Sequence, residues 1–196
     1  VRALWRALDF DNSGSTTLEE LDPLTAQLLA QLWEWAVAMF GAKPSASLWA
    51  AIDRRRSRKL SYQSFVQEMS QLGFKGRLKT VTRWLDWDAK RHVTEEDLRF
   101  FDRWKPPKWL VAKPNPEAAE VLKTLLKQRY GHHLKAWRSA MDKDNSNSCN
   151  WHEFVHAAQV VRFSGDIAGA WLHFDQTVCG SITFEDLDPG FHAVLM

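Results

Sequence analysis

The chain has 196 residues, of which 45% are hydrophobic and 26% are charged, so it can bury a sizeable core and is not a disordered chain. Its net charge of +2 is too small to indicate nucleic acid as a partner, and no run of about 18 apolar residues predicts a membrane span. Two cysteines, Cys149 and Cys179, give no disulfide framework and favour a reducing, cytoplasmic compartment. The sequence starts at Val1 without a methionine or a signal-like apolar segment, and we interpret it as a fragment of a longer chain.

The first segment with a chemical pattern is residues 9–20, where oxygen-bearing residues recur at alternate positions around a glycine. Gly14, at the sixth position of this twelve-residue stretch, allows a sharp turn, and the glutamate at its end can offer two oxygens to one cation. The candidate ligands are Asp9, Asp11, Ser13, Ser15 (through its carbonyl) and Glu20. Ca²⁺ takes about six to eight oxygen ligands, so this spacing predicts a calcium site. The competing interpretation is an acidic surface turn.

A helix is predicted over residues 23–40, because Pro23 suits a first helical turn and apolar residues follow at helical spacing. The residues that share its main apolar face are Leu28, Leu32, Trp35 and Met39. A second apolar row lies on the neighbouring face, so we expect this helix to be buried on more than one side. Gly41 should end it.

Two weaker copies of the loop begin at Asp53 and Asp86. In the first copy, Ser64 stands where the closing carboxylate is needed, and a run of arginines brings positive charge toward the cation. In the second copy, Lys90 occupies the fifth position and the shorter Asp97 closes the loop. We expect neither copy to bind calcium.

A boundary is predicted in the proline-rich segments 105–108 and 113–116, beyond which a second long helix should start at Pro116 and stop at Gly131. The full ligand pattern returns at residues 142–153, with Asn147 in place of the glycine. Asparagine adopts the left-handed region more easily than most residues. The candidate ligands here are Asp142, Asp144, Ser146, Ser148 and Glu153.

An internal repeat relates the two halves of the chain, because residues 64–98 match residues 153–187 at a constant offset of 89 positions. Matching pairs include Phe65 with Phe154, Phe74 with Phe163, Gly76 with Gly165 and Asp86 with Asp175. Loops therefore come in pairs, and the partner of the first loop would lie upstream of Val1. The loop at Asp175 offers a thiol at Cys179 and a short closing Asp186, so we expect it to be weak or empty.

The loops at Asp9 and Asp142 resemble those of the EF-hand superfamily, in particular multi-repeat calmodulin-like calcium-binding proteins. The resemblance implies an all-α fold, built as an array of paired helix–loop–helix repeats with short β bridges between the loops. It implies Ca²⁺ as the bound ion, no catalytic activity, and a protein partner or target helix. The expected divisions are a lone EF-hand over residues 1–22, a degenerate pair over 23–115, and a pair with one intact loop over 116–196.

Two short motifs admit other interpretations. Residues His152 to His156 match the His-Glu-x-x-His zinc signature, but Glu153 already has a place in the calcium pattern and no third ligand is evident. The basic run 54–59 fits a solvated degenerate loop, a localisation signal, a lipid or nucleic-acid contact, or a phosphorylation site at Ser57.

The sequence thus predicts a calcium sensor or calcium-responsive interaction module. The alternatives are a structural EF-hand scaffold subunit of a larger assembly and a regulatory segment of a larger enzyme. The eleven tryptophans are expected mainly to fill the core, with an aromatic docking surface as the competing interpretation.

Overall fold

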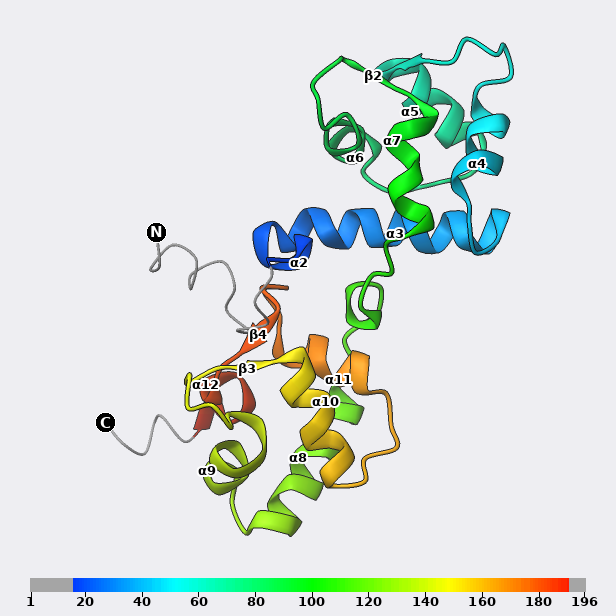
Figure 1. Cartoon of the computed structure of the whole chain (residues 1–196). Coiled ribbons are helices and arrows are strands. Elements are labelled where there is room, and N and C mark those ends of the chain that lie inside the picture. The colour runs from blue at the N-terminus through cyan, green and yellow to red at the C-terminus, as the bar shows by residue number, and fades with distance from the viewer. Residues whose placement is uncertain (1–15, 191–196) are drawn as a thin grey trace. The chain divides into compact units, whose positions relative to one another are not determined.

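The computed structural model describes residues 16–190, and the regular structure of this part of the chain is helical apart from short two-residue strands (Figure 1). The predicted all-α class is therefore confirmed. The chain divides into two compact units. Unit 1 contains described residues 16–23 and 112–190, and unit 2 contains residues 24–111. No helix in the described part of the chain is both long and apolar enough to cross a membrane.

Unit 2 consists of short helices around one small β ladder. Its elements are α3 (Pro23–Phe40, starting at the unit boundary), α4 (Ser45–Ile52), β1 (Leu60–Ser61), α5 (Tyr62–Gln71), α6 (Leu78–Leu85), β2 (His92–Val93), α7 (Glu95–Leu98), η1 (Arg99–Asp102) and η2 (Lys108–Leu110). β1 and β2 pair antiparallel with Leu60 opposite Val93. α5 packs on α6, and α4 packs on α7 and η1.

Helix α3 has the predicted bounds, but its buried face differs from the predicted one. Met39, which ends the predicted stripe, is 57% exposed. The buried residues of the helix are Thr25, Ala26, Leu29, Ala30, Leu32 and Ala36. The predicted face contained only large apolar residues, whereas half of the buried residues are alanines. Their small side chains allow neighbouring elements to approach the helix backbone closely. The Trp33 indole N–H donates to the Phe101 carbonyl at 3.0 Å and ties α3 to η1.

Unit 1 repeats this order of elements, with α8 in the place of α3. Its elements are α2 (Leu18–Leu21), α8 (Pro116–Tyr130), α9 (His133–Ala136), the π-helical turn η3 (Trp137–Met141), β3 (Cys149–Asn150), α10 (Trp151–Val160), α11 (Ile167–Phe174), β4 (Ser181–Ile182) and α12 (Phe184–Leu187). Helix α8 has the predicted start and stop, and Gly131 ends it at a φ of 90°. β3 and β4 pair antiparallel with Cys149 opposite Ile182.

Aromatic side chains fill the core of unit 1. The ring of Phe154, which is fully buried, lies edge-on to Trp171 at 5.1 Å and to Phe174 at 6.1 Å. Such edge-to-face pairs add to the stabilisation that burial alone gives. The core interpretation is thus confirmed for Trp137 and Trp171, whereas Trp87 in unit 2 is 80% exposed.

Candidate metal-binding loops

The four described loops share one backbone arrangement. Each begins with a buried aspartate whose carboxylate accepts a hydrogen bond from the amide five residues later. The donor residues are Arg58 (2.7 Å), Arg91 (2.6 Å), Asn147 (3.2 Å) and Gly180 (2.8 Å). All four donors have a positive φ, between 62° and 82°. The buried carboxylate therefore holds a tight turn even where the glycine has been replaced, at a conformational cost of about 1 kcal/mol for a residue such as arginine.

Oxygen atoms gather inside the loop at residues 142–153. Asp144 Oδ1 accepts from the amide of Ser146 at 3.0 Å. The hydroxyl of Ser146 lies 3.0 Å from the hydroxyl of Ser148 and donates to the Ser148 carbonyl at 3.1 Å. Carboxylate, hydroxyl and carbonyl oxygens are the donor types that Ca²⁺ takes in proteins. The predicted ligands of this loop are therefore chemically suited to the ion.

The first ligand of this loop has a counter-ion that the pattern did not include. Asp142 is fully buried, and its Oδ2 accepts from Arg138 Nη1 at 3.0 Å. The arginine lies one helical turn earlier and is half exposed, with 49% of its side chain accessible. A cation that binds the loop must share or replace this contact.

Glu153, at the end of the loop, caps the helix that follows. Its amide donates to the Asn150 side chain at 3.0 Å, and its Oε2 accepts from the Asn150 amide at 3.1 Å. This reciprocal capping box fixes the start of α10. Burial raises the pKa of Glu153 above its usual range, the Asn150 amide lowers it, and the negative charges of Asp144 and Asp142 raise it further. These three carboxyl groups therefore act on one another electrostatically.

The loop at Asp175 holds itself together with fewer ligand oxygens. Asp175 Oδ1 accepts from the Cys179 amide at 2.9 Å, and the Cys179 thiol donates to the Ser181 carbonyl at 3.1 Å. Asp186 accepts from both the amide and the hydroxyl of Thr183, at 2.7 and 2.8 Å. Burial raises the pKa of Asp175. This loop is closed by a short aspartate that caps α12.

Most of the first predicted site, Asp9, Asp11, Ser13 and Ser15, lies outside the described residues. Its closing residue, Glu20, is described. Glu20 Oε2 accepts from the Thr17 amide at 2.8 Å, within a capping box at the start of α2. Glu20 Oε1 is buried and has no hydrogen-bond partner in the described part of the chain. One carboxylate oxygen is thus left for a further ligand.

The loop at Asp86 in unit 2 supplies its own counter-charge. Lys90 Nζ lies 3.1 Å from Asp88 Oδ2 and 3.4 Å from Asp97 Oδ1. The hydrogen bond to Asp88 raises the pKa of Lys90, which keeps the ammonium charged. Tyr62 donates its hydroxyl to Asp86 at 2.6 Å. Burial acts to raise the pKa of Asp86, but the hydrogen bonds from Tyr62 and two loop amides outweigh it and the pKa is lowered.

The described residues bring no acidic, histidine or cysteine side chains together as a ready metal site, and this includes the carboxylates of the loop at residues 142–153. Residues 16–190 contain no cluster of three or more His, Cys, Asp or Glu side chains that could hold a metal ion. His152 and His156 of the zinc-like motif are both exposed on α10. The motif Glu153 is engaged in its helix cap.

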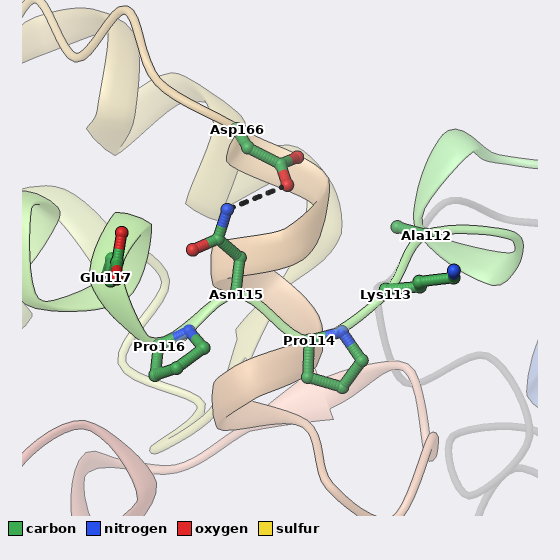
Figure 2. A pocket seen from close by; sticks show the side chains of 7 residues that line it. All are labelled: Ala112, Lys113, Pro114, Asn115, Pro116, Glu117 and Asp166. Carbon is green, nitrogen blue, oxygen red and sulfur yellow. Dashed lines mark hydrogen bonds between the residues drawn. The ribbon is translucent and has the colours of Figure 1, made fainter.

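An open hollow of about 500 Å³ lies where α8 begins (Figure 2). Its polar groups hold two helix starts together, because the Asn115 side chain accepts from the Ala118 amide and donates to Asp166 Oδ2 at 3.3 Å. Asp166 Oδ1 in turn accepts from the Gly169 amide at 2.9 Å. These groups serve helix capping, so the hollow is a structural junction.

One pair in unit 1 escaped the sequence analysis. His133 lies 2.7 Å from Asp188 through Nδ1, and its side chain is only 18% exposed. The two residues are 55 positions apart, and no local pattern links them.

Comparisons with known proteins do not show a family for this chain. No family model matches it, and no curated protein matches it. A solved structure described as "Crystal structure of C-terminal domain of PF110239" has 14% sequence identity to this chain. That comparison covers 85% of this chain and 86% of the other, with a TM-score of 0.27. A TM-score this low carries no argument about fold or function.

Proposed function

We propose that this protein binds Ca²⁺ through EF-hand loops at residues 9–20 and 142–153, as a multi-repeat calmodulin-like array. Two kinds of observation support the proposal. The sequence pattern puts oxygen ligands at the spacing that the ion requires. The described loops also share a turn, and residues at the eighth position of each loop pair across a short β ladder.

The loop at residues 142–153 carries the proposal. In an EF-hand, serine hydroxyls and backbone carbonyls supply part of the ligand set. The site is therefore not built from acidic, histidine or cysteine side chains alone. Asp142, Asp144 and Glu153 would contribute the carboxylates. Burial raises the pKa of Glu153, and the charges of Asp144 and Asp142 raise it further; a divalent cation would relieve both the burial of this charge and its repulsion by its neighbours. Ser146 and Ser148 would complete the shell.

The proposal is tested by calorimetric titration of the metal-free chain with Ca²⁺. We expect two sites with dissociation constants on the order of 10⁻⁷ to 10⁻⁵ M, one lost with Glu20→Gln and the other with Glu153→Gln. Glu117→Gln, at an exposed position on α8 outside any loop, is the matched control and should leave both sites intact. An absence of calcium heat, or binding indifferent to both loop substitutions, would refute calcium binding at these loops.

A structural EF-hand scaffold is the second candidate, and one observation favours it. The loops of unit 2 keep their shape through their own hydrogen bonds and through Lys90, without need of a metal. Calcium-dependent binding of an apolar dye would favour a sensor that exposes a surface for a target helix. Calcium that raises only the melting temperature would favour the scaffold. We further propose a cytoplasmic location, on the basis of the two free cysteines.

A further inference from the structure

The loop after α4 carries a dense positive charge. Five of the six residues at positions 54–59 are arginine or lysine, and all six residues are exposed. None of these five side chains forms an ion pair with another described residue. The only acidic residue of the segment, Asp53, is buried and is 6% exposed. The charge of this loop is therefore presented to its surroundings without neutralisation.

Hydrogen bonds to the buried Asp53 carboxylate hold this basic loop in one shape. Asp53 Oδ1 accepts from both the amide and the hydroxyl of Ser57 at 2.8 Å, and its Oδ2 accepts from the Arg58 amide at 2.7 Å. The Ser57 hydroxyl also lies 2.7 Å from the Lys59 carbonyl, a second acceptor for its single proton. A ligand that meets this loop would thus find the backbone already ordered, which lowers the entropy cost of binding.

Exposed tryptophans lie at the same end of unit 2. Trp84 is 41% exposed at the end of α6, and Trp87 is 80% exposed in the loop that follows. The β1–β2 ladder joins this second loop to the basic loop. In Figure 1 both loops lie at the end of unit 2 opposite α3. Basic and large aromatic side chains therefore share one end of the unit.

We propose that this end of unit 2 docks on the surface of an anionic lipid bilayer. A cluster of basic residues is attracted by the negative surface potential of anionic lipids. Tryptophan is the side chain that favours the headgroup region, where its indole is partly apolar and partly hydrogen-bonded. Few carboxylates oppose the approach, because Asp53 is buried and Asp88 is paired with Lys90, which leaves Glu68 beside five basic residues.

A bilayer fits these features better than a nucleic acid does. Single-stranded nucleic acid is usually bound along a basic groove that follows its backbone over several nucleotides. Here five cations crowd into one short loop rather than lining a groove, and the whole chain carries a net charge of only +2. A planar anionic membrane can bind a basic cluster confined to one loop. Its headgroup region also places an apolar layer next to the charges, where Trp87 can insert.

The test is flotation of the full chain with vesicles in the presence of a calcium chelator, so that its result is independent of the proposed calcium sites. We expect binding to mixed phosphatidylcholine and phosphatidylserine vesicles and none to phosphatidylcholine alone. Combining Arg54→Gln, Arg55→Gln and Lys59→Gln should lower the partition coefficient about a hundredfold. These three positions avoid Arg56 and Arg58, whose positive φ angles make substitution a risk to the loop.

The matched control removes three charges at the other end of the same unit. Lys75, Arg77 and Lys79 are exposed around the link from α5 to α6. This link lies on the α3 side, because the Phe74 ring contacts Trp35 of α3 at 5.4 Å. The corresponding triple glutamine variant should bind vesicles as the parent chain does.

A second pair of variants tests the aromatic contribution. Trp87→Ser should weaken binding about tenfold, because the indole loses its place in the headgroup region. Leu24→Ser, which removes a 62% exposed side chain from the start of α3, should have no effect. Circular dichroism of each variant establishes that it is folded before flotation.

Several outcomes would overturn the proposal. These are no vesicle binding at low salt, equal binding to neutral vesicles, or an equal loss with both triple variants. Binding of polyuridylate or polyglutamate through Arg54, Arg55 and Lys59, without vesicle binding, would also overturn it and assign the loop to another anionic partner.

Discussion

Replacing Arg138 by methionine should increase the calcium affinity of the loop at residues 142–153. The guanidinium Nη1 lies 3.0 Å from Asp142 Oδ2, an oxygen of the first proposed ligand. Calcium binding must give up part of this contact. Methionine keeps an apolar stem of similar length but carries no charge, so it removes the competitor while leaving much of the packing.

The size of the effect follows from the exposure of the pair. Asp142 is fully buried, but 49% of the Arg138 side chain is accessible to water, which screens the interaction. Ion pairs with such exposed partners contribute about 0.2–1 kcal/mol. Losing that competition should raise the calcium association constant about 1.5- to 5-fold, and added salt should shrink the difference between variant and parent.

Calorimetric calcium titration of the variant measures this change directly. Arg129→Met on α8 is the matched control, because it removes the same charge at an exposed position without a described ion pair. A general electrostatic effect would raise the affinity equally in both variants. If Arg138→Met behaved as Arg129→Met does, or bound calcium more weakly than the parent chain, the competition argument would be wrong.

Three further predictions concern stability. Burial raises the pKa of Glu153, so the metal-free fold loses stability as pH rises from the unfolded-state pKa through the raised folded-state pKa. Glu153→Gln should therefore raise the melting temperature in chelator at neutral pH and lose this advantage in acid. Thermal unfolding measured across pH tests this. In Gly165→Ala the new Cβ would lie 2.5 Å from the buried Phe163 ring, so we expect a loss of about 1–3 kcal/mol in denaturant unfolding, whereas Gly190→Ala, with 3.8 Å of clearance, should be neutral. Arg91→Gly relieves a φ of 62° and should stabilise unit 2 by about 0.5–1 kcal/mol in the same assay; a destabilised variant would mean that the arginine side chain contributes more than its backbone strain costs.

Local chemistry made several parts of the fold predictable. Pro23 and Pro116 mark true helix starts, and Gly41 and Gly131 follow true helix ends with positive φ. The repeated spacing of Phe74 and Gly76 with Phe163 and Gly165 also has a physical cause. In both copies the phenylalanine ring lies so close to the glycine that a Cβ could not be added without moving the ring. This repeat can be recognised in the sequence because the phenylalanine ring requires a glycine two positions later.

The candidate site was predictable only in part, because the ligand pattern does not include the side chains that contact the ligands from neighbouring elements. Arg138 stands four residues before the loop and became relevant only once the helical turn brought it onto Asp142. The His133–Asp188 contact depends on how distant helices pack. Met39 lies on an apolar stripe yet is exposed, because burial depends on which neighbouring elements cover the helix.

The loops of the two units differ in the source of their positive charge. In unit 2, Lys90 places an ammonium between Asp88 and Asp97, so the carboxylates are neutralised by a cation that cannot dissociate from the chain. In unit 1, Arg138 reaches only the first carboxylate, and Glu153 keeps a raised pKa from burial and from the neighbouring charges. A free cation would therefore neutralise more uncompensated carboxylate charge in the loop at residues 142–153 than in the loop at Asp86. Under the proposed calcium function, this contrast predicts that a metal acts on the turn at residues 142–153 and not on the turn at Asp86.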